Sequence, residues 1–250
     1  MERITSRKNS VIQHMRSLAV DRSSRRAAGE FLCDGEKLLQ EALQFGAEVR
    51  CVLWCEGREK DTPIKSFSVP PELLQYVSVM DHSPGPVFSV SIPKVTLPER
   101  PGHVLVLENV QDPGNVGTVL RTASAFGIDL VVLTGACADV YNPKTVRSTM
   151  GALFRQNVTE LPPEELTAYL RRAELPLLGA ALQPGAGDIR GSLPERCAVA
   201  IGNEGHGLSR EMLGCCDKTV IIPMEPCSES LNASVAASLF MWEMVRNKGG

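Results

Sequence analysis

The segment Asn203-Glu204-Gly205-His206-Gly207-Leu208-Ser209 carries a carboxylate, an amide and two glycines within seven residues. It follows the apolar stretch Cys197 to Ile201, which predicts a buried strand. A turn that leaves the end of a buried strand is a common place to bind a small molecule. An ordinary glycine-rich connection is the alternative, but it does not require Glu204 between the strand and the glycines. Ser209 is expected to cap the next helix, and His206 is assigned no catalytic role of its own.

A second polar turn, Asp112-Pro113-Gly114-Asn115, follows an apolar stretch that ends at Leu107. Asn115 can cap a helix that begins at Val116, and Arg121 would lie within the first two turns of that helix. The guanidinium would then lie near the carboxyl end of a sheet, where ligands bind in open α/β folds. For this segment alone, an ordinary capped helix with a surface arginine is the alternative.

A third polar segment, Ser230-Leu231-Asn232, follows Ile222-Pro223-Met224 and opens a helix that is mostly apolar as far as Val245. Free backbone N–H groups at a helix start can bind a ligand. Small residues just after Asn232 would let a flat ligand or another backbone approach closely. The helix body indicates core or subunit interface rather than a cofactor site.

Basic residues are concentrated in two places, although the net charge of −3 gives no global preference for nucleic acid. Residues 1–30 hold seven Lys or Arg and three acids. This excess fits a basic nucleic-acid-contacting face or the solvated face of a helix, and a mitochondrial transit peptide is a less favoured alternative. Lys144 and Arg147 lie three residues apart on a predicted helix, which suits phosphate oxygens. Plain solvent exposure is the alternative for this pair.

Composition excludes several classes of protein. Hydrophobic residues make up 43% and charged residues 22% of the 250, so the chain can bury a core and disorder is not expected. The eight cysteines include no CxxC pair and no histidine at zinc-finger spacing, so free thiols and no metal site are expected. No apolar run approaches the ~20 residues that cross a membrane, and no signal peptide is expected. The expected compartment is a reducing cytoplasm.

Before residue 95, helical and strand patterns alternate and predict a small α/β unit. Residues 95–102 hold two prolines and a glycine and are predicted to be a linker. From His103 onward, nearly continuous apolar runs alternate with helical stretches, which predicts a parallel sheet covered by helices on both faces. The predicted helices of the first part are 11–19, 36–45 and 70–76, with a strand at 49–54, and the predicted strands of the second part are 104–107, 130–133, 177–182, 199–201 and 220–222.

Taken together, the three polar segments resemble the signature motifs of the SpoU (TrmH-like) RNA 2′-O-ribose methyltransferases. The resemblance covers nearly the whole chain, with all three motifs in order. It implies an α/β fold with an N-terminal L30e-like RNA substrate-binding domain over residues 1–97. It further implies a C-terminal SPOUT methyltransferase domain over residues 98–250, with a parallel sheet and a deep trefoil knot, and a homodimer formed through that domain.

The reaction implied by the resemblance is transfer of a methyl group from S-adenosyl-L-methionine to a ribose 2′-hydroxyl of RNA, without a metal. Arg121 is discussed in this family as the general base. An arginine stays charged in proteins, so anchoring an RNA phosphate and stabilising charge on the 2′-oxygen is the role expected here. The residues that the motifs imply are Asn115, Arg121, Glu204, Ser230 and Asn232 for catalysis, and Thr134, Gly135, Gly202, Ile222 and Leu231 for the cofactor. Lys144 and Arg147 are the RNA-binding residues expected from their spacing.

Several alternatives stay open at this point. Ribosomal RNA is the expected substrate, and transfer RNA is the alternative, because both kinds of enzyme share these motifs. Methylation of a base, as in the related TrmD branch, is a second alternative, and a non-catalytic RNA-binding assembly protein is a third. The sequence leaves open the methylated nucleotide, the proton acceptor, and the choice between a housekeeping and an antibiotic-resistance role.

Overall fold

The computed structural model of the chain describes residues 1–225 and 230–246 and divides into two compact units. Unit 1 consists of Met1–Lys94 and Asp139–Arg155, and unit 2 consists of Val95–Ala138 and Gln156–Gly250. The contiguous ranges expected from the sequence, 1–97 and 98–250, therefore differ from these units chiefly at Asp139–Arg155. That segment packs with the N-terminal unit although it lies far along the chain.

Unit 1 is built on a five-stranded mixed sheet of order β1-β4-β3-β5-β2. β5 pairs antiparallel with both β2 and β3, whereas β4 pairs parallel with β1 and β3. The helices expected in the N-terminal part are all present. The strands are β1 Glu2–Arg3, β2 Glu30–Asp34, β3 Val49–Cys55, β4 Ser66–Val69 and β5 Val87–Ser91. The helices are α1 Ser10–Val20, α2 Arg22–Ala28, α3 Glu36–Gln44, α4 Pro71–Val77, α6 Pro143–Ser148 and the 3₁₀ helix η1 Ala152–Phe154.

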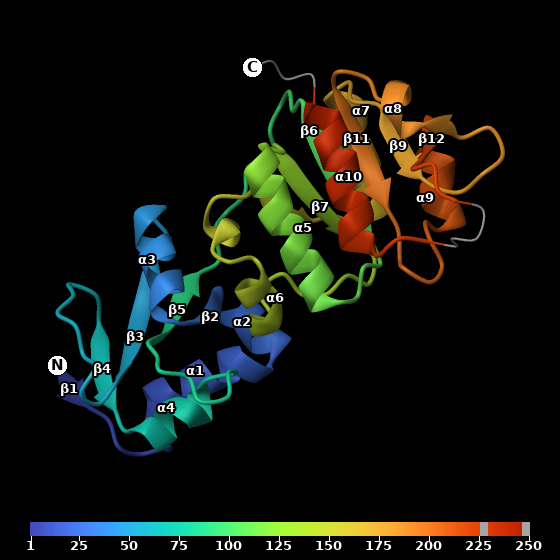
Figure 1. Cartoon of the computed structure of the whole chain (residues 1–250). Coiled ribbons are helices and arrows are strands. Elements are labelled where there is room, and N and C mark those ends of the chain that lie inside the picture. The colour runs from blue at the N-terminus through green and yellow to red at the C-terminus, as the bar shows by residue number, and fades with distance from the viewer. Residues whose placement is uncertain (226–229, 247–250) are drawn as a thin grey trace. The chain divides into compact units, whose positions relative to one another are not determined.

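Helices α1 and α4 lie side by side on one face of this sheet (Figure 1). The apolar spacing that predicts α1 places Ile12, Met15 and Leu18 on one side of the helix, where all three are fully buried. They share a core with Leu74 and Val77 of α4. Burial of this kind, rather than helix propensity, supplies most of the stability of a helix of this length.

The segment Asp139–Arg155 is held in unit 1 by aromatic packing and a buried ion pair. The Phe31 ring on β2 lies 5.0 Å from the ring of Tyr141 and 6.4 Å from that of Phe154, measured between centroids. The Arg25 guanidinium donates to Asp139 Oδ2 from Nη2 at 2.6 Å and from Nε at 3.1 Å, and both side chains are nearly inaccessible. The segment is therefore part of the interior of unit 1.

Unit 2 is built on a seven-stranded sheet of order β10-β12-β9-β11-β6-β7-β8, in which every neighbouring pair is parallel. This confirms the parallel sheet expected from the continuous apolar runs. The strands are β6 His103–Glu108, β7 Leu130–Thr134, β8 Val158–Glu160, β9 Leu177–Ala180, β10 Gly187–Asp188, β11 Cys197–Ile201 and β12 Lys218–Ile221. The helices are α5 Pro113–Phe126, α7 Pro163–Arg172, α8 Ile189–Ser192, α9 Arg210–Cys215 and α10 Ala233–Val245.

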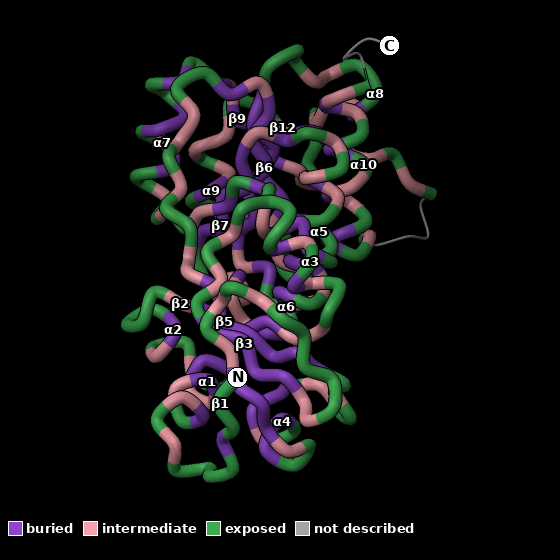
Figure 2. The backbone as a smooth tube through the Cα atoms, turned by 90° about the vertical axis from the view of Figure 1, so that its left-hand side faces the viewer, coloured by how far each residue is buried: buried purple, intermediate pink, exposed green. Residues whose placement is uncertain are grey.

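Helices cover both faces of the unit 2 sheet. α7 and α9 contribute Leu166, Leu170 and Met212 to a core that contains Val104 of β6 and Ala198 of β11. α5 and α10 pack against each other, and α10 also contacts β6 and β11 (Figure 1). Every residue of β6, β7 and β11 is buried, and Figure 2 shows such buried positions along the strands. Among the described helices, none combines the length and apolar character required to cross a membrane.

The strand register places the ends of three central strands at one edge of the sheet. Ile201 of β11 lies opposite Leu107 of β6, and Glu108 of β6 lies opposite Thr134 of β7. The polar turns that follow these strands must therefore meet at this edge, which is where open α/β sheets bind ligands.

Candidate active site

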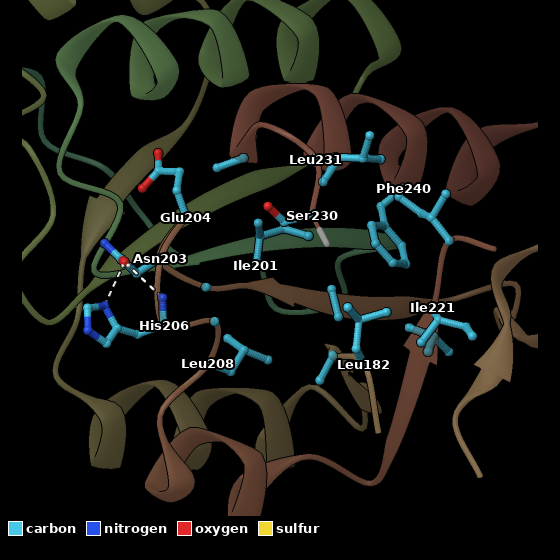
Figure 3. A pocket seen from close by; sticks show the side chains of 18 of the residues that line it. Leu182, Ile201, Asn203, Glu204, His206, Leu208, Ile221, Ser230, Leu231 and Phe240 are labelled. Carbon is cyan, nitrogen blue, oxygen red and sulfur yellow. Dashed lines mark hydrogen bonds between the residues drawn. The ribbon is translucent and has the colours of Figure 1, made fainter. Parts of the chain in front are cut away.

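A cavity of about 410 Å³ lies at the carboxyl ends of β9, β11 and β12, beside the start of α10. Its volume is within the range of about 300–1,000 Å³ that small-molecule sites occupy. Figure 3 shows Asn203, Glu204 and His206 at one end of the cavity and Leu182 and Phe240 at the other. The cavity therefore suits a ligand with one apolar part and one polar part.

The turn after β11 closes on itself and forms one wall of the cavity. Asn203 and Gly207 exchange two backbone hydrogen bonds, of 3.1 and 2.8 Å between N and O. The Asn203 side-chain Oδ1 accepts from the backbone N–H of Gly205 at 2.9 Å and of His206 at 3.2 Å. A Cβ at Gly202 would lie 2.2 Å from the carbonyl carbon of Gly207. Glycine is therefore required at position 202 for the backbone to fold back so closely.

A buried carboxylate fixes the far end of this turn. Glu108 is the last residue of β6, and its two carboxylate oxygens accept from Ser209, one from the backbone N at 2.8 Å and the other from Oγ at 2.6 Å. Ser209 Oγ in turn accepts from Met212 N at 3.0 Å, which confirms Ser209 as the cap of α9. Glu108 is a residue of the site for which the sequence predicts no individual role. A carboxylate at the end of an otherwise apolar strand is the signal that could have identified it.

One side chain from each of the three polar segments joins a single hydrogen-bonded network. Asn115 Nδ2 donates to Glu204 Oε1 at 2.7 Å, and Asn232 Nδ2 donates to Asn115 Oδ1 at 3.1 Å. Asn232 Oδ1 caps α10 by accepting from the backbone N–H of Ser234 at 2.9 Å and of Val235 at 3.3 Å. The side chains of Asn115 and Asn232 thus connect the Glu204 carboxylate to the start of α10 and fix its orientation.

Asn115 is not the helix cap expected from the sequence, and that prediction is wrong. The helix α5 begins earlier, at Pro113, and its cap is Asp112, whose Oδ1 accepts from Asn115 N at 2.7 Å. A carboxylate at the cap and a proline at the first helical position are both favourable, which explains the earlier start. Because Asp112 satisfies the helix end, the Asn115 amide is available to Glu204 and Asn232.

Arg121 is not brought into this network. Its side chain is exposed on α5 and lines no part of the cavity. Six positions along an α-helix amount to about 600° of rotation, so Arg121 points about 120° away from the direction of Asn115. The spacing that was expected to aim Arg121 at the pocket therefore places its guanidinium in solvent on the neighbouring helix surface.

The residues expected to hold a cofactor divide into two groups. Gly202, Ile222 and Leu231 line the cavity. Thr134 and Gly135 do not line it, because Thr134 ends β7 and Gly135 follows it, and β7 lies one strand beyond β6. They are joined to the cavity wall indirectly, through Asn109.

Asn109 connects the turn after β7 to the turn after β11. Its Oδ1 accepts from Ala136 N at 2.7 Å, and its backbone oxygen accepts from Asn203 Nδ2 at 3.0 Å. A Cβ at Gly135, whose φ is +67°, would lie 2.4 Å from Asn109 Oδ1. Thr134 and Gly135 thus support the wall of the cavity rather than lining it.

Three further predicted residues complete the set. Ser230 lines the cavity, although the segment 226–229 just before it lies outside the described residues. Lys144 and Arg147 are exposed on α6, as their expected helix requires, but α6 belongs to unit 1. In residues 1–225 and 230–246, no group of three or more His, Cys, Asp or Glu side chains is arranged to hold a metal ion.

Two of the described cysteines in unit 2, Cys197 and Cys216, are not activated as nucleophiles. The seven described cysteines are free. Burial raises the pKa of the Cys197 thiol at the start of β11 to about 12. Burial, with nearby Cys215 and acidic groups, also raises the pKa of Cys216 to about 12. Both thiols therefore stay protonated near neutral pH and are poor nucleophiles.

The comparisons with known proteins supply an independent assignment. The model of the SpoU rRNA Methylase family matches residues 102–242. A 23S rRNA (uridine(2479)-2′-O)-methyltransferase of Streptomyces viridochromogenes is 33% identical, over 98% of this chain and 92% of that protein. A 23S rRNA (guanosine(2553)-2′-O)-methyltransferase of Bacillus subtilis is 31% identical, over 98% of this chain and 99% of that protein. The crystal structure of a SpoU methyltransferase from Streptomyces viridochromogenes in complex with the cofactor AdoMet matches with a TM-score of 0.87 at 31% identity, over 96% of this chain and 98% of that one.

Proposed function

This chain belongs to the SpoU rRNA methylase family, and on that premise we propose that it transfers a methyl group from S-adenosyl-L-methionine to a ribose 2′-hydroxyl of ribosomal RNA. The observation that carries the proposal is the network of Asn232, Asn115 and Glu204 beside the cavity. It unites the three polar segments of the sequence in one place, next to a space of the size a nucleoside cofactor needs. Two relatives that match nearly the whole chain are named as 23S rRNA 2′-O-methyltransferases.

The cavity residues fit the cofactor. The cavity combines an apolar wall, formed by Leu182, Ile221 and Phe240, with polar residues such as Asn203 and Glu204. Such a combination suits an adenosyl group, whose base is flat and whose sugar and amino-acid parts are polar. When bound, S-adenosyl-L-methionine supplies an activated methyl group, and the protein supplies position and electrostatics.

The polar end of the cavity would receive the ribose. Glu204 can accept a hydrogen bond from the reacting 2′-hydroxyl, because Asn115 binds only one of its carboxylate oxygens. Ser230, which also lines the cavity, would hold the ribose from the other side. Together these groups would hold the ribose oxygen toward the activated methyl group that the cofactor supplies. Asn232 contributes by holding Asn115 in place.

Arg121 would act on the RNA rather than on the cofactor. Its exposure on α5 leaves the guanidinium available to a phosphate, which it can bind through two parallel hydrogen bonds. By anchoring that phosphate, Arg121 would hold the RNA so that the reacting ribose stays at the cavity. Lys144 and Arg147, both exposed, would bind other phosphates of the substrate from unit 1.

The proposal extends to the assembly and to the finer details of the fold. Val235, Leu239 and Trp242 of α10 are 47%, 42% and 54% exposed and recur at helical spacing, so they form an apolar stripe that supports homodimerisation through unit 2. The family resemblance supports a deep trefoil knot in unit 2 and an L30e-like, RNA-binding unit 1. Free thiols at the described cysteines support a reducing cytoplasm as the compartment.

The test is methyl transfer by the purified full-length chain. The chain is incubated with methyl-labelled S-adenosyl-L-methionine and, in parallel, with protein-free 23S rRNA, 16S rRNA and bulk tRNA. Label is expected in 23S rRNA, and it should survive alkaline hydrolysis in a dinucleotide, because a methylated 2′-oxygen cannot attack the adjacent phosphodiester. Label in tRNA alone would support the tRNA alternative. Binding of rRNA without transfer to any RNA would support the non-catalytic assembly protein.

A further inference from the structure

Two guanidinium groups gather at one aromatic ring beside α1 and α4 of unit 1, and a third cation is their neighbour in the sequence just before α1. These four residues, Arg7, Lys8, Arg16 and Tyr76, are here called the α1–α4 surface. The guanidinium carbon of Arg7 lies 4.7 Å from the Tyr76 ring centroid, and that of Arg16 lies 5.2 Å from it. Arg16 Nη1 also donates to the Tyr76 backbone oxygen at 3.0 Å. Two guanidinium groups therefore share one tyrosine.

The backbone that carries these cations is held in place. Gln13 Nε2 donates to the Arg7 backbone oxygen at 2.5 Å, and Asn9 Oδ1 caps α1 by accepting from Val11 N at 2.9 Å. Lys8 N donates to Ser6 Oγ at 3.2 Å. These bonds fix Arg7 and Lys8 at the N-terminus of an eleven-residue helix, where the helix dipole adds to the positive potential.

The α1–α4 surface differs from other basic residues near the N-terminus. Arg3 is paired with Glu56 at 2.5 Å, and Arg25 is buried against Asp139. Within the ranges the structure describes, Arg7, Lys8 and Arg16 make no ion pair with a carboxylate. The basic residues of positions 1–30 therefore include two kinds. Arg3 and Arg25 form ion pairs within unit 1, whereas the charges of Arg7, Lys8 and Arg16 are not neutralised by a neighbouring carboxylate in the described part of the chain.

This combination matches the chemistry of RNA better than that of a protein partner. Phosphate oxygens are bound by arginine and lysine, and unstacked bases pack on aromatic rings and guanidinium planes. The core of a protein interface needs exposed apolar side chains. In the described helices α1 and α4, the large exposed apolar side chains amount to Val20 alone, at the end of α1 away from Arg7 and Lys8.

We propose that Arg7, Lys8, Arg16 and Tyr76 form a docking surface for the backbone of the RNA substrate. This rests on the proposed function in supposing that RNA is the substrate. Arg7 and Lys8 bind phosphates, and the guanidinium groups that lie over the Tyr76 ring of α4 offer a flat surface to a base. The surface adds affinity from unit 1 and takes no part in the binding of the cofactor in unit 2.

A charge-matched pair of variants of the full-length chain tests this surface. Arg7→Gln with Lys8→Gln removes two positive charges from the surface. Arg3→Gln with Arg50→Gln removes two positive charges from exposed arginines of the same unit that already pair with Glu56 and Glu48. Any long-range effect of net charge is therefore the same in both. Binding of protein-free 23S rRNA is measured between 50 and 200 mM KCl.

The two variants should differ in salt dependence. Each phosphate contact contributes roughly 0.7–0.9 to the slope of log affinity against log salt concentration, so loss of two contacts should reduce the slope by about 1.4–1.8. The ratio of wild-type affinity to variant affinity should therefore fall about tenfold between 50 and 200 mM KCl. The control variant should keep the wild-type slope to within about 0.5.

Substitutions at the ring and its second arginine extend the test. Tyr76→Leu keeps an apolar side chain on α4 but removes the ring, and it should weaken rRNA binding by about fivefold or more. Arg16→Lys keeps the charge but loses the guanidinium plane, and its effect should be smaller. Cofactor affinity, measured by calorimetry, should stay at the wild-type value in every variant.

The outcomes separate this inference from the proposed function. If the Arg7/Lys8 variant binds rRNA with the slope and affinity of the control, the docking surface is overturned, even if the wild-type enzyme methylates rRNA. If wild type transfers no methyl group to any RNA, the proposed function is overturned. The salt slopes still decide whether the surface binds RNA, because binding is measured without turnover.

Discussion

The two units use polar side chains in opposite ways. In unit 2, Asn232, Asn115 and Glu204 form a partly accessible network beside a cavity, with one hydrogen bond to each neighbour. In unit 1, Arg25 and Asp139 form an ion pair deep in the interior, where Arg25 also donates to the Leu18 backbone oxygen at 2.8 Å. One arrangement leaves polar atoms available for a ligand, and the other leaves none.

The difference separates chemistry from assembly. A reacting group must be fixed to a fraction of an ångström and yet remain accessible, which amide-to-carboxylate hydrogen bonds achieve. A buried charge must be fully paired because desolvation is expensive, so the Arg25–Asp139 pair can only serve to hold Asp139–Arg155 in unit 1. Substitutions in the two units should therefore damage different properties, and the following predictions run from the largest expected effect to the smallest.

Removing the buried charge of unit 1 should cost the most. Arg25→Ala leaves Asp139 buried without its partner, which should destabilise unit 1 by about 3–5 kcal/mol. Urea unfolding followed by circular dichroism measures the loss. Arg190→Ala, which breaks the exposed pair with Asp188, is the control and should change the midpoint only slightly. An Arg25→Ala protein as stable as wild type would show that the segment is held by aromatic packing alone.

Arg121 should show the reverse pattern, with loss of activity and no loss of stability. Its side chain is exposed, so Arg121→Ala should unfold like wild type and bind S-adenosyl-L-methionine normally. Single-turnover methyl transfer should fall about 10²–10³-fold, which corresponds to about 2.7–4 kcal/mol. Arg121→Lys keeps the charge but not the bidentate geometry and should also be slow. A wild-type rate in either variant would make Arg121 an ordinary surface residue.

Two glycines of the cavity wall offer a matched pair. A Cβ at Gly202 would meet the backbone of Gly207 at 2.2 Å, whereas a Cβ at Gly205 would meet only Asn203 Oδ1, at 3.5 Å. Overpacking typically costs about 1–3 kcal/mol, so Gly202→Ala should weaken cofactor binding by about 5- to 150-fold. Gly205→Ala should bind nearly as wild type. Calorimetry measures the affinity of both variants for S-adenosyl-L-methionine. Equal affinities would mean that the turn after β11 does not shape the cofactor site.

Asp34 should give a small, pH-dependent effect confined to unit 1. Burial raises the pKa of its carboxyl above the ordinary value of 3.8, although hydrogen bonds from Ser78 and Ser83 and the charge of Arg147 oppose the shift. Because this pKa is higher in the folded than in the unfolded protein, the Asp34 carboxyl adds to the stability of the folded state at pH below its unfolded pKa. That contribution is lost as the pH rises through the folded pKa. Asp34→Asn should therefore flatten the stability profile from pH 4 upward. An unchanged profile would contradict the burial effect.

The sequence predicted elements better than it predicted their grouping. The parallel sheet follows from apolar runs such as 104–107, because strands covered on both faces carry no polar alternation. The assignment of Asp139–Arg155 to unit 1 could not be predicted, since it depends on tertiary contacts of Phe31 and Arg25 with residues more than 100 positions away. A fragment that begins at residue 98 would contain this segment without those partners.

The site shows the same limit at the level of single residues. The meeting of Asn115, Glu204 and Asn232 was implied by the resemblance of the three motifs to a known family. Its physical reason is that parallel strands end at one edge of the sheet. The cap at Asp112 was missed, since aspartate and asparagine are both good caps and the sequence does not reveal which one the chain uses. The direction of Arg121 differs from the prediction because six residues of α-helix turn its side chain about 120° away from that of Asn115.

The most direct test of the account is the position of the methyl group. Protein-free 23S rRNA methylated by the full-length chain is digested to nucleosides and analysed by mass spectrometry, with fragmentation at the glycosidic bond. The account predicts one methylated nucleoside whose extra mass stays with the ribose, formed by wild type and at a much lower rate by Glu204→Gln. Extra mass on the base, or no methylated nucleoside with any RNA, would contradict it.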